Sequence, residues 1–288
     1  MNVRPRLFTV GCMCLLGISL AGCANREKGP DWQLRQARHD LQTRDYQQAM
    51  VHVTRALNLR PGYGPAYLVR ARVHEAQGFL AMALDDYARA LDSPEDRAEA
   101  LRRSGDLFRR LGRYAQAISS YEQLIRDDPD DVEGYLGRAG VLIKQKRYEP
   151  AREDLRRAEG IRPDDSRIAA ALGQLFEAQG KFSRALREYE RAVSLDKQNV
   201  DTRILLGTLH ARENRIEEGL AAYGTVLQMD PGRGDVYYKR SFLHLAAGNY
   251  GKALDDTVRA RFLGEEVDAA YVSRLKQQVQ ERAADAGP

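Results

Sequence analysis

Small and large apolar residues alternate with polar stretches in a pattern that recurs every 34 residues along the chain. A frame that begins at Pro30 divides residues 30–267 into seven consecutive segments without an insertion, and position 17 of each segment is large and apolar. Positions 8 and 20 are small in every segment: Ala37, Ala71, Gly105, Ala139, Gly173, Gly207 and Ser241 at position 8, and Ala49, Ala83, Ala117, Ala151, Ala185, Gly219 and Ala253 at position 20. Self-similarity at a fixed period of this length is typical of a repeat protein.

Each segment predicts two helices that cross at close range. Helices approach closely only where side chains are small, so positions 8 and 20 are expected to meet at the crossing, with the residue at position 17 filling the space beside them. Proline stands at position 32 in four segments, and because it lacks an N–H group it is expected to end the second helix. Aspartates beside these prolines, as in DDPDD from Asp127, are expected to cap the following helix.

This pattern resembles the tetratricopeptide repeat, a pair of antiparallel helices in each 34-residue unit. The resemblance covers about four fifths of the chain and implies an all-α fold, a right-handed α-solenoid of helix–turn–helix repeats. It departs from the family consensus at position 4, where tryptophan is absent. The sixth repeat is expected to pack most loosely, because Asn214, Gly219 and Gly224 each lower helix propensity by up to about 1 kcal/mol.

The C-terminal residues continue the repeat pattern for half a unit. Residues 268–282 match a first helix, with Tyr271, Val272 and Leu275 as its apolar face, but the partner helix never follows. A solenoid needs a terminal element that shields its open end from water, so we expect a capping helix here. Residues 283–288 are expected to form a disordered tail.

The first 23 residues follow a different pattern, which is typical of a secretion signal. Arg4 and Arg6 precede an apolar run from Leu7 to Leu20. This run is too short to span a bilayer, which takes roughly 20 apolar residues, but it suits the core of a signal peptide. The alternatives are an ordinary cleaved signal and an uncleaved N-terminal anchor.

The sequence LAGC at residues 20–23 resembles a bacterial lipobox. The resemblance implies that residues 1–22 are removed as a lipoprotein signal peptide and that Cys23 becomes the first mature residue, carrying acyl chains such as palmitate. Two or more chains anchor a protein stably to a membrane. Ala24 follows the cysteine, which by the sorting rule of enteric bacteria implies the outer membrane and a periplasm-facing protein. Residues 23–29 then form the acylated N-terminus and a short tether.

Charge and cysteine usage narrow the possible functions. The net charge is +4 at pH 7 with 30% charged residues, so the chain does not have the basic excess expected of a nucleic-acid-binding protein. Cys12, Cys14 and Cys23 are the three cysteines, so the rest of the chain can hold no disulfide, cysteine metal site or thiol nucleophile. The chain also lacks the G-x-S-x-G, H-E-x-x-H, phosphate-loop and C-x-x-C motifs. We therefore expect no catalytic site, no metal and no cofactor.

Histidines and paired aspartates are the remaining candidates for chemistry. His74, His210 and His244 all stand at position 11 of their repeats. This shared position predicts that they lie inside the helix pair, although the last two, one repeat apart, leave a functional alternative open. The aspartates of the DDPDD stretch lack the D-x-D-x-D-G spacing of a calcium loop, so they are interpreted as helix caps.

The resemblance places the binding surface on the first helices, which line the concave face of such solenoids through positions 2, 5, 6, 9, 12 and 13. These positions are basic in the early repeats and apolar in the late ones, and the candidate partner-binding residues are Arg38, Arg72, Arg102, Arg103, Arg109, Arg110, Ile204, Tyr238 and Phe242. Arginine forks suit carboxylates of a partner, and apolar side chains suit the anchors of a helix or an extended peptide. The alternative is a solvated arginine face paired with nearby acids, and apolar residues that pack on neighbouring repeats.

The expected function is a non-catalytic scaffold, anchored by lipid in the outer membrane, that recruits or assembles components of a cell-envelope machine. This layout looks like that of the repeat lipoproteins that act as pilotins for the type IV pilus secretin, and like that of those that organise peptidoglycan enzymes. A carrier of small ligands or lipids and an enzyme built onto repeats are the other classes considered. A cytosolic co-chaperone is disfavoured, because no repeat pairs lysine at position 5 with asparagine at position 9.

Overall fold

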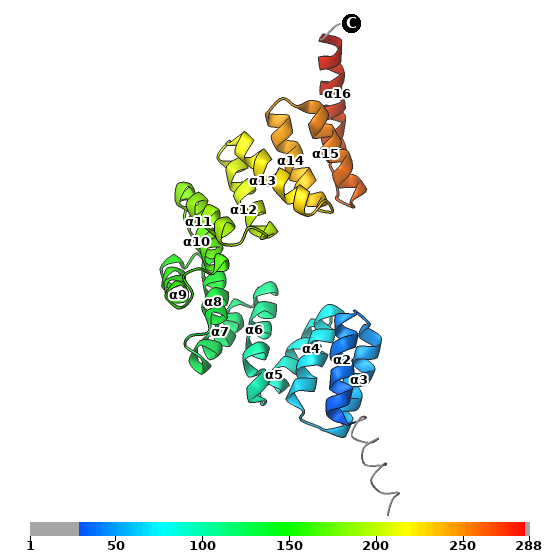
Figure 1. Cartoon of the computed structure of the whole chain (residues 1–288), viewed down its shortest axis with the longest axis vertical. Coiled ribbons are helices and arrows are strands. Elements are labelled where there is room, and N and C mark those ends of the chain that lie inside the picture. Colours follow the sequence, from blue (N-terminus) through cyan, green and yellow to red (C-terminus); the bar gives the residue numbers. More distant parts are fainter. Residues whose placement is uncertain (1–28, 286–288) are drawn as a thin grey trace, which may run out of the picture. The chain divides into compact units, whose positions relative to one another are not determined.

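The computed structural model describes residues 29–285, and within this range the chain forms fifteen helices and no strand (Figure 1). The first helices of the repeats are α2 (Pro30–Gln42), α4 (Gly64–Ala76), α6 (Pro94–Arg110), α8 (Val132–Lys144), α10 (Ser166–Ala178), α12 (Val200–Arg212) and α14 (Gly234–Ala246). The second helices are α3 (Tyr46–Leu59), α5 (Leu80–Ala90), α7 (Tyr114–Asp127), α9 (Tyr148–Ile161), α11 (Phe182–Leu195), α13 (Ile216–Met229) and α15 (Tyr250–Phe262), and α16 (Ala269–Asp285) follows. The predicted all-α repeat fold is confirmed.

The helices between residues 29 and 285 belong to two compact units, one that ends at Pro129 and one that begins at Asp130. In the described part of the chain, unit 1 contains α2–α7 and unit 2 contains α8–α16. Within each unit, every first helix packs against the second helix that follows it, and each second helix packs against the next first helix. None of the helices between residues 29 and 285 combines the length and apolarity needed to cross a membrane. The predicted lipid acceptor Cys23 lies outside the described residues.

The turn between the two helices of a repeat has the same geometry in all seven repeats. The residue at position 15 adopts a positive φ, and it is glycine in four repeats, as at Gly78 (φ 82°). The N–H of Gly78 donates to the carbonyl of Glu75, and the N–H of Phe79 donates to that of His74 over 2.8 Å. This pair of hydrogen bonds is the Schellman motif, which satisfies the free carbonyl groups at the end of the first helix. Arg44, Lys146 and Asn214 occupy the same position in repeats 1, 4 and 6.

The small residues at positions 8 and 20 are buried in every repeat, as predicted from their size. The space beside them, however, is filled mainly by position 24, where Tyr87, Tyr121, Tyr189 and Tyr223 are at most 2% exposed. The large residue at position 17 is instead the first residue of the second helix and is only half-buried. The expectation for position 17 was wrong because a residue at a helix end lies at the edge of the contact rather than at its centre.

Most helix ends follow the predicted signals. α3, α7, α9 and α13 each end two residues before proline, and the Asp131 carboxylate accepts a hydrogen bond from the N–H of Glu133 at the start of α8. α14 is an exception, because its N-cap is Arg233 and Asp230 accepts a hydrogen bond from the N–H of Gly232 instead. α6 is another, because it begins at Pro94, four residues before its place in the frame. Proline in the first turn and the acidic Glu95 and Asp96 beside it favour this earlier start.

Two further expectations concern the sixth repeat and the C-terminus. In the sixth repeat, a Cβ placed at Gly219 would lie 2.8 Å from Leu243, whereas one placed at Gly224 would have no neighbour closer than 3.9 Å, so the expected loose packing is seen at Gly224 and not at Gly219. At the C-terminus, α16 continues to Asp285, past the expected boundary at residue 282, since Ala283 and Ala284 are strong helix formers. The predicted apolar face of α16 is buried, with Leu275 fully enclosed, while Ser273, Arg274 and Lys276 on its other face are exposed.

Candidate functional site

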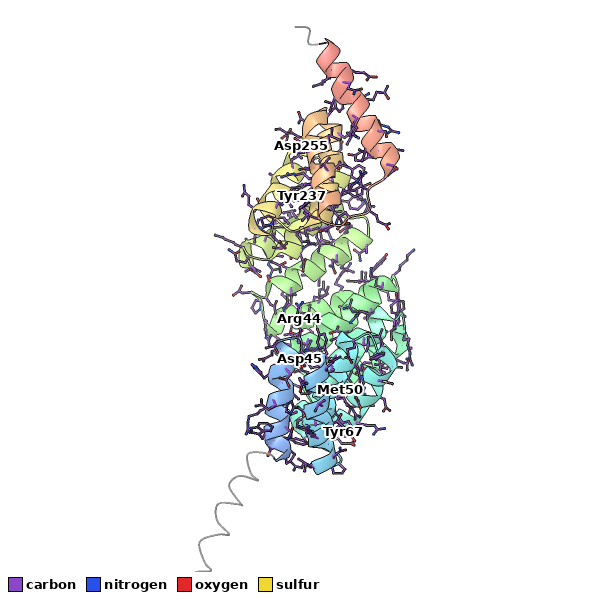
Figure 2. All side chains as sticks on the ribbon, turned by 90° about the vertical axis from the view of Figure 1, so that its right-hand side faces the viewer. Arg44, Asp45, Met50, Tyr67, Tyr237 and Asp255 are labelled. Carbon is purple, nitrogen blue, oxygen red and sulfur yellow. The ribbon has the colours of Figure 1, made fainter. Side chains whose placement is uncertain are left out.

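Unit 1 contains a cavity of about 380 Å³ at the end of its first helices, next to the turn that joins α2 to α3. Four arginines from three elements line it together with one acidic residue, and we call it the arginine pocket: Leu41, Gln42, Arg44, Tyr46, Arg72, Glu75, Ala76, Arg103 and Arg110. Figure 2 labels Arg44 and Asp45 in this turn. The pocket brings together three of the six predicted arginines, Arg72, Arg103 and Arg110.

Glu75 is the acidic residue of the arginine pocket, and its carboxylate is already engaged. One oxygen accepts a hydrogen bond from Arg110 over 2.7 Å, and the other accepts one from the buried Tyr87 hydroxyl over 2.7 Å. Arg103 lies 4.0 Å from Glu75 and donates to Glu99 over 2.6 Å. Glu75 therefore balances part of the charge of Arg103 and Arg110.

Arg72 is half-buried in α4 and makes no hydrogen bond or ion pair with any residue that the structure describes. Burial, and after it the positive charge of Arg103, lowers the pKa of the Arg72 guanidinium. The nearby Glu99 carboxylate acts in the opposite direction and offsets part of this effect, although no hydrogen bond joins it to Arg72. The Arg72 side chain is thus held in the pocket wall with its hydrogen-bonding capacity unused.

The other predicted arginines of unit 1 lie outside the pocket. The guanidinium groups of Arg102 and Arg109 lie 3.8 Å and 3.5 Å from the carboxylate of Asp106 on the same helix. All three side chains are more than a third exposed. The solvated-face alternative describes these two arginines well, because exposed pairs of this kind contribute about 1 kcal/mol or less. Arg38 lies exposed on α2. The structure thus divides the predicted set into pocket residues and surface residues.

In unit 2, the predicted apolar residues lie on α12 and α14. Ile204 is half-buried and packs against the core cluster that contains Leu227 and Val236. Phe242 is 45% exposed and stacks on the ring of Tyr271 from α16, with ring centres 4.7 Å apart, and Tyr238 lies 4.9 Å from Phe242. The capping helix therefore covers part of this apolar surface and leaves one face of Phe242 open to solvent.

The three histidines at position 11 lie in the interior of their helix pairs, as predicted. Their Nδ1 atoms have no hydrogen-bond partner among the described residues. The Nε2 atoms of His74 and His244 lie 3.7 Å and 3.8 Å from the carboxylates of Asp86 and Asp256. Within residues 29–285, no group of three histidine, aspartate or glutamate side chains is placed to hold a metal ion.

Burial lowers the pKa of His74, His210 and His244 below the ordinary value of histidine. The unfolded chain therefore binds more protons than the folded chain below about pH 6.5, and the free energy of unfolding is expected to fall as the pH drops through this range. Thermal denaturation at pH 7.5 and pH 5.5 measures the effect. Replacing all three histidines with glutamine should flatten the pH dependence, and an unchanged slope would contradict the assignment.

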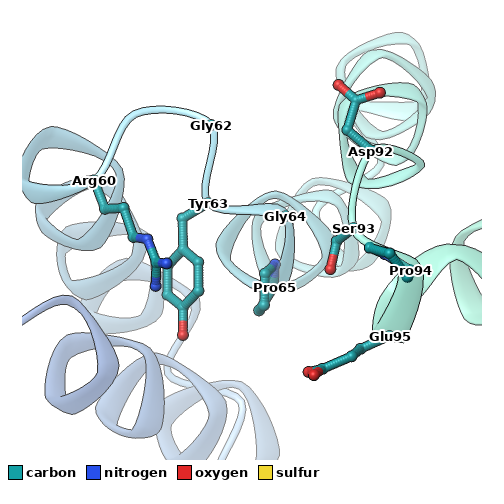
Figure 3. A pocket seen from close by; sticks show the side chains of 9 residues that line it. All are labelled: Arg60, Gly62, Tyr63, Gly64, Pro65, Asp92, Ser93, Pro94 and Glu95. Atoms are coloured by element: carbon teal, nitrogen blue, oxygen red, sulfur yellow. The ribbon is translucent and has the colours of Figure 1, made fainter.

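A second cavity of unit 1, of about 460 Å³, lies between the loops that precede α4 and α6 (Figure 3). The Arg60 guanidinium lies 4.8 Å from the centre of the Tyr63 ring. Burial, followed by a hydrogen bond to Asp31, raises the pKa of Tyr63 to about 12. Gly64 is required here, because a Cβ would come within 2.2 Å of the Ser93 side chain. These contacts serve the packing of the loops.

Sequence reasoning missed Arg44 and Tyr46 as parts of this site. Arg44 stands in the turn rather than at one of the six first-helix positions considered. No pattern in the sequence singles it out, because position 15 is also occupied by a residue other than glycine in repeats 4 and 6, where Lys146 and Asn214 stand.

Comparison with known proteins identifies similar sequences and folds. A family model described as "Tetratricopeptide repeat" matches residues 102–166, 170–232 and 204–262, which together make up more than half of the chain. Among curated proteins, a DnaJ homolog subfamily C member 7 homolog of Schizosaccharomyces pombe is 25% identical over 232 residues, which are 75% of this chain and 48% of that protein. The chain thus spans about half the length of this relative.

Two solved structures illustrate the likeness in fold. A tetratricopeptide repeat protein from Parabacteroides merdae has a TM-score of 0.67 and 17% identity, with 87% of this chain and 98% of the other covered. PilW, described as a widely conserved type IV pilus biogenesis factor, has a TM-score of 0.60 and 20% identity, with 70% of this chain and 94% of the other covered. At such low identity, these likenesses establish the fold.

Proposed function

Because this chain belongs to the tetratricopeptide repeat family, whose members bind other proteins or peptides, we propose that it is a non-catalytic binding scaffold tethered by lipid to the outer membrane. In this proposal it faces the periplasm and recruits components of a cell-envelope machine. The observation that carries the binding role is the arginine pocket, in which four guanidinium groups meet one carboxylate that is already engaged. Such a surface is complementary to an anionic group of a partner.

The membrane anchor rests on the sequence at residues 20–23, where LAGC follows a basic and then an apolar segment. The Cys23→Ala variant removes the thiol that would accept the lipid. We expect it to accumulate as an unprocessed precursor that takes up no labelled palmitate in its bacterial host, whereas the wild type is processed and labelled. Normal labelling of the variant would contradict the anchor.

The type IV pilus is the envelope machine that we favour, because PilW shares this repeat fold and is described as a pilus biogenesis factor. Assembly of the pilus secretin is the step proposed. The alternative is an adaptor for peptidoglycan enzymes, and a carrier of small ligands or lipids is a further candidate that would use the exposed face of Phe242.

Chemical crosslinking of the lipidated protein in its native envelope tests this function. We expect crosslinks to pilus components that disappear in an Arg103→Glu/Arg110→Glu variant, in which two guanidinium groups of the pocket become carboxylates. An Arg102→Glu/Arg109→Glu variant is the matched control, because it makes the same charge change on the same helix outside the pocket. Crosslinks to peptidoglycan enzymes would favour the adaptor instead, and the absence of any protein partner would refute the scaffold.

A further inference from the structure

Three positions at the start of the second helices are exposed in all seven repeats, all of which lie in the described part of the chain. These are positions 16, 19 and 22 of the 34-residue frame. The large apolar residues that they hold are Phe79 at position 16, Met82 at position 19 and Val51 at position 22, and all three belong to repeats 1 and 2. The other repeats have polar or charged residues there, apart from Pro150 and Ala221. The apolar side chains are therefore not a requirement of the repeat.

These side chains lie around a groove of about 530 Å³ on α3. We call it the α3 groove, and its lining residues are Gln47, Met50, Val51, Thr54, Arg55 and Gln77. Figure 2 labels Met50, which is half-buried, and Val51 is 40% exposed. Phe79 follows Gln77 by two residues, and Met82 lies in the first turn of α5; they are 53% and 56% exposed. Large apolar side chains that gather on a surface usually mark a contact with a partner or a membrane.

The surface around the α3 groove carries little charge. α3 contains neither aspartate nor glutamate, and Arg55 is the one charged residue that lines the groove. The Asp45 carboxylate caps α3 by accepting a hydrogen bond from the N–H of Gln48, and Asp85 on α5 pairs with Arg89 over 3.2 Å. The equivalent helix of repeat 4, α9, exposes Glu149, Glu153, Arg156 and Arg157. Removing the α3 surface from water would thus cost much less than removing that of α9.

The position of the α3 groove in the chain favours a lipid bilayer as its partner. α2 begins at Pro30, and residues 24–29 between it and Cys23 span at most about 25 Å. α2 and α3 pack side by side and run in opposite directions, so the end of α3 at Leu59 lies beside the start of α2 (Figure 1). Val51 is only about 12 Å further along α3. A lipid on Cys23 would keep this surface within reach of the bilayer, at a high effective concentration.

We propose that the second helices of repeats 1 and 2 rest on the lipid bilayer, with Val51, Phe79 and Met82 at the boundary between headgroups and acyl chains. This inference rests on the proposed lipid anchor at Cys23. Apolar side chains at this boundary add to the membrane affinity that acyl chains supply, and Arg55 is placed to meet a lipid phosphate. The contact uses the second helices, so the first helices, which carry most of the arginine pocket, stay available to a protein partner.

Fluorescence quenching in vesicles tests the contact. The mature lipidated protein is reconstituted into vesicles of phosphatidylethanolamine and phosphatidylglycerol, some of whose lipids carry a nitroxide on the upper part of an acyl chain. Because no cysteine follows Cys23, the variants Val51→Cys, Arg35→Cys and Glu153→Cys each place a single bimane label. We expect quenching at residue 51 to be at least twofold stronger than at residues 35 and 153.

The two control labels separate docking from mere proximity to the anchor. Arg35 is exposed on α2 and lies only five residues from Pro30, so a unit that tumbles freely on its tether would bring both labels to the bilayer equally. Glu153 is exposed at position 22 of repeat 4, which is the position that Val51 occupies in repeat 1.

The double variant Val51→Glu/Met82→Gln tests the apolar side chains themselves. It copies Glu153 and Gln48, which hold these positions in repeats 4 and 1. Both replaced side chains are exposed, so the thermal midpoint should not change. A label on Phe79→Cys should lose at least half of its quenching in this background. Ser119→Glu is the matched control, because it places the same charge at position 22 of repeat 3, and it should leave the quenching unchanged.

Equal quenching at residues 51 and 35 would overturn the docking, as would a double variant that is quenched like the wild type. A dimer in detergent that the double variant abolishes, measured by analytical ultracentrifugation, would assign the surface to a second copy of the chain and also overturn it. The proposed anchor fails separately, when Cys23 of the purified wild type reacts with maleimide and the protein does not float with vesicles. That result removes the docking as well, whereas equal quenching in a protein that floats removes the docking alone.

Discussion

Replacing Arg70 with methionine is expected to lower the free energy of unfolding of unit 1 by about 3–5 kcal/mol at pH 8. Arg70 in α4 makes two hydrogen bonds to Asp86 in α5, over 2.8 Å and 2.6 Å, and the Asp86 side chain is only 3% exposed. Removing the arginine leaves a buried carboxylate without its partner. His74, 3.7 Å from Asp86, is neutral at this pH and cannot replace the lost charge.

Another repeat of the chain has an uncharged residue pair in place of this ion pair. The same two positions hold Arg138 and Asp154 in repeat 4, and Arg240 and Asp256 in repeat 7, each with two hydrogen bonds, but repeat 6 has Leu206 and Ala222. The double variant Arg70→Leu/Asp86→Ala copies repeat 6 into repeat 2. It should cost much less than Arg70→Met, because a buried ion pair replaced as a whole leaves no charge behind.

Chemical denaturation of the purified full chain measures both changes. The control is Arg89→Met in α5, which breaks a pair with Asp85 in which both side chains are more than half exposed. Exposed pairs contribute about 1 kcal/mol or less, so this variant should be close to the wild type. If Arg70→Met were as stable as Arg89→Met, the buried pair would not contribute to the stability of unit 1.

These buried ion pairs could not be predicted from the sequence, whereas the small residues at the helix crossing could. Positions 8 and 20 could be predicted because steric exclusion allows only small residues at a helix crossing, so the same residue class recurs in all seven repeats. Arginine at position 7 and aspartate at position 23 occur together in only three repeats, and Ser104 with Ser120 or Leu206 with Ala222 fill the same space elsewhere. A contact that several residue pairs satisfy leaves no constant pattern along the chain.

The candidate site could be predicted from the sequence only in part. The resemblance to the family indicated the first-helix positions, and these included Arg72, Arg103 and Arg110. It could not separate them from Arg102 and Arg109, because that distinction depends on which carboxylate each guanidinium reaches in space. Arg44 could not be predicted either, because repeats 4 and 6 also have a residue other than glycine at this turn position.

Gly173→Ala is expected to lower the free energy of unfolding of unit 2 by about 1–3 kcal/mol. Gly173 in α10 faces the ring of Tyr189 in α11, and an added Cβ would lie 2.5 Å from two carbons of that ring. Tyr189 is fully buried, and its hydroxyl donates to Glu177 over 2.8 Å, so the ring is held in place. α10 and α11 must therefore move apart, at a cost that exceeds the gain of up to about 1 kcal/mol in helix propensity from glycine to alanine.

Gly140→Ala is the matched control and should have the opposite sign. Gly140 lies in α8 of the same unit, and an added Cβ would meet no atom within 4 Å, so only the gain in helix propensity of up to about 1 kcal/mol remains. The second repeat combines Ala71 with Tyr87 in one core cluster, which shows that alanine and tyrosine are compatible when the helices are spaced for both.

Tyr189→Leu in the Gly173→Ala background tests whether the clash is the cause. This double variant copies repeat 4, where Ala139 and Leu155 stand at the same two positions and are both fully buried. Gly173→Ala should then lower the free energy of unfolding less when residue 189 is leucine than when it is tyrosine. Chemical denaturation of the four proteins of the double-mutant cycle measures this difference. If Gly173→Ala were as stabilising as Gly140→Ala, or equally costly in both backgrounds, then the contact of position 8 with position 24 would not set the spacing of the two helices.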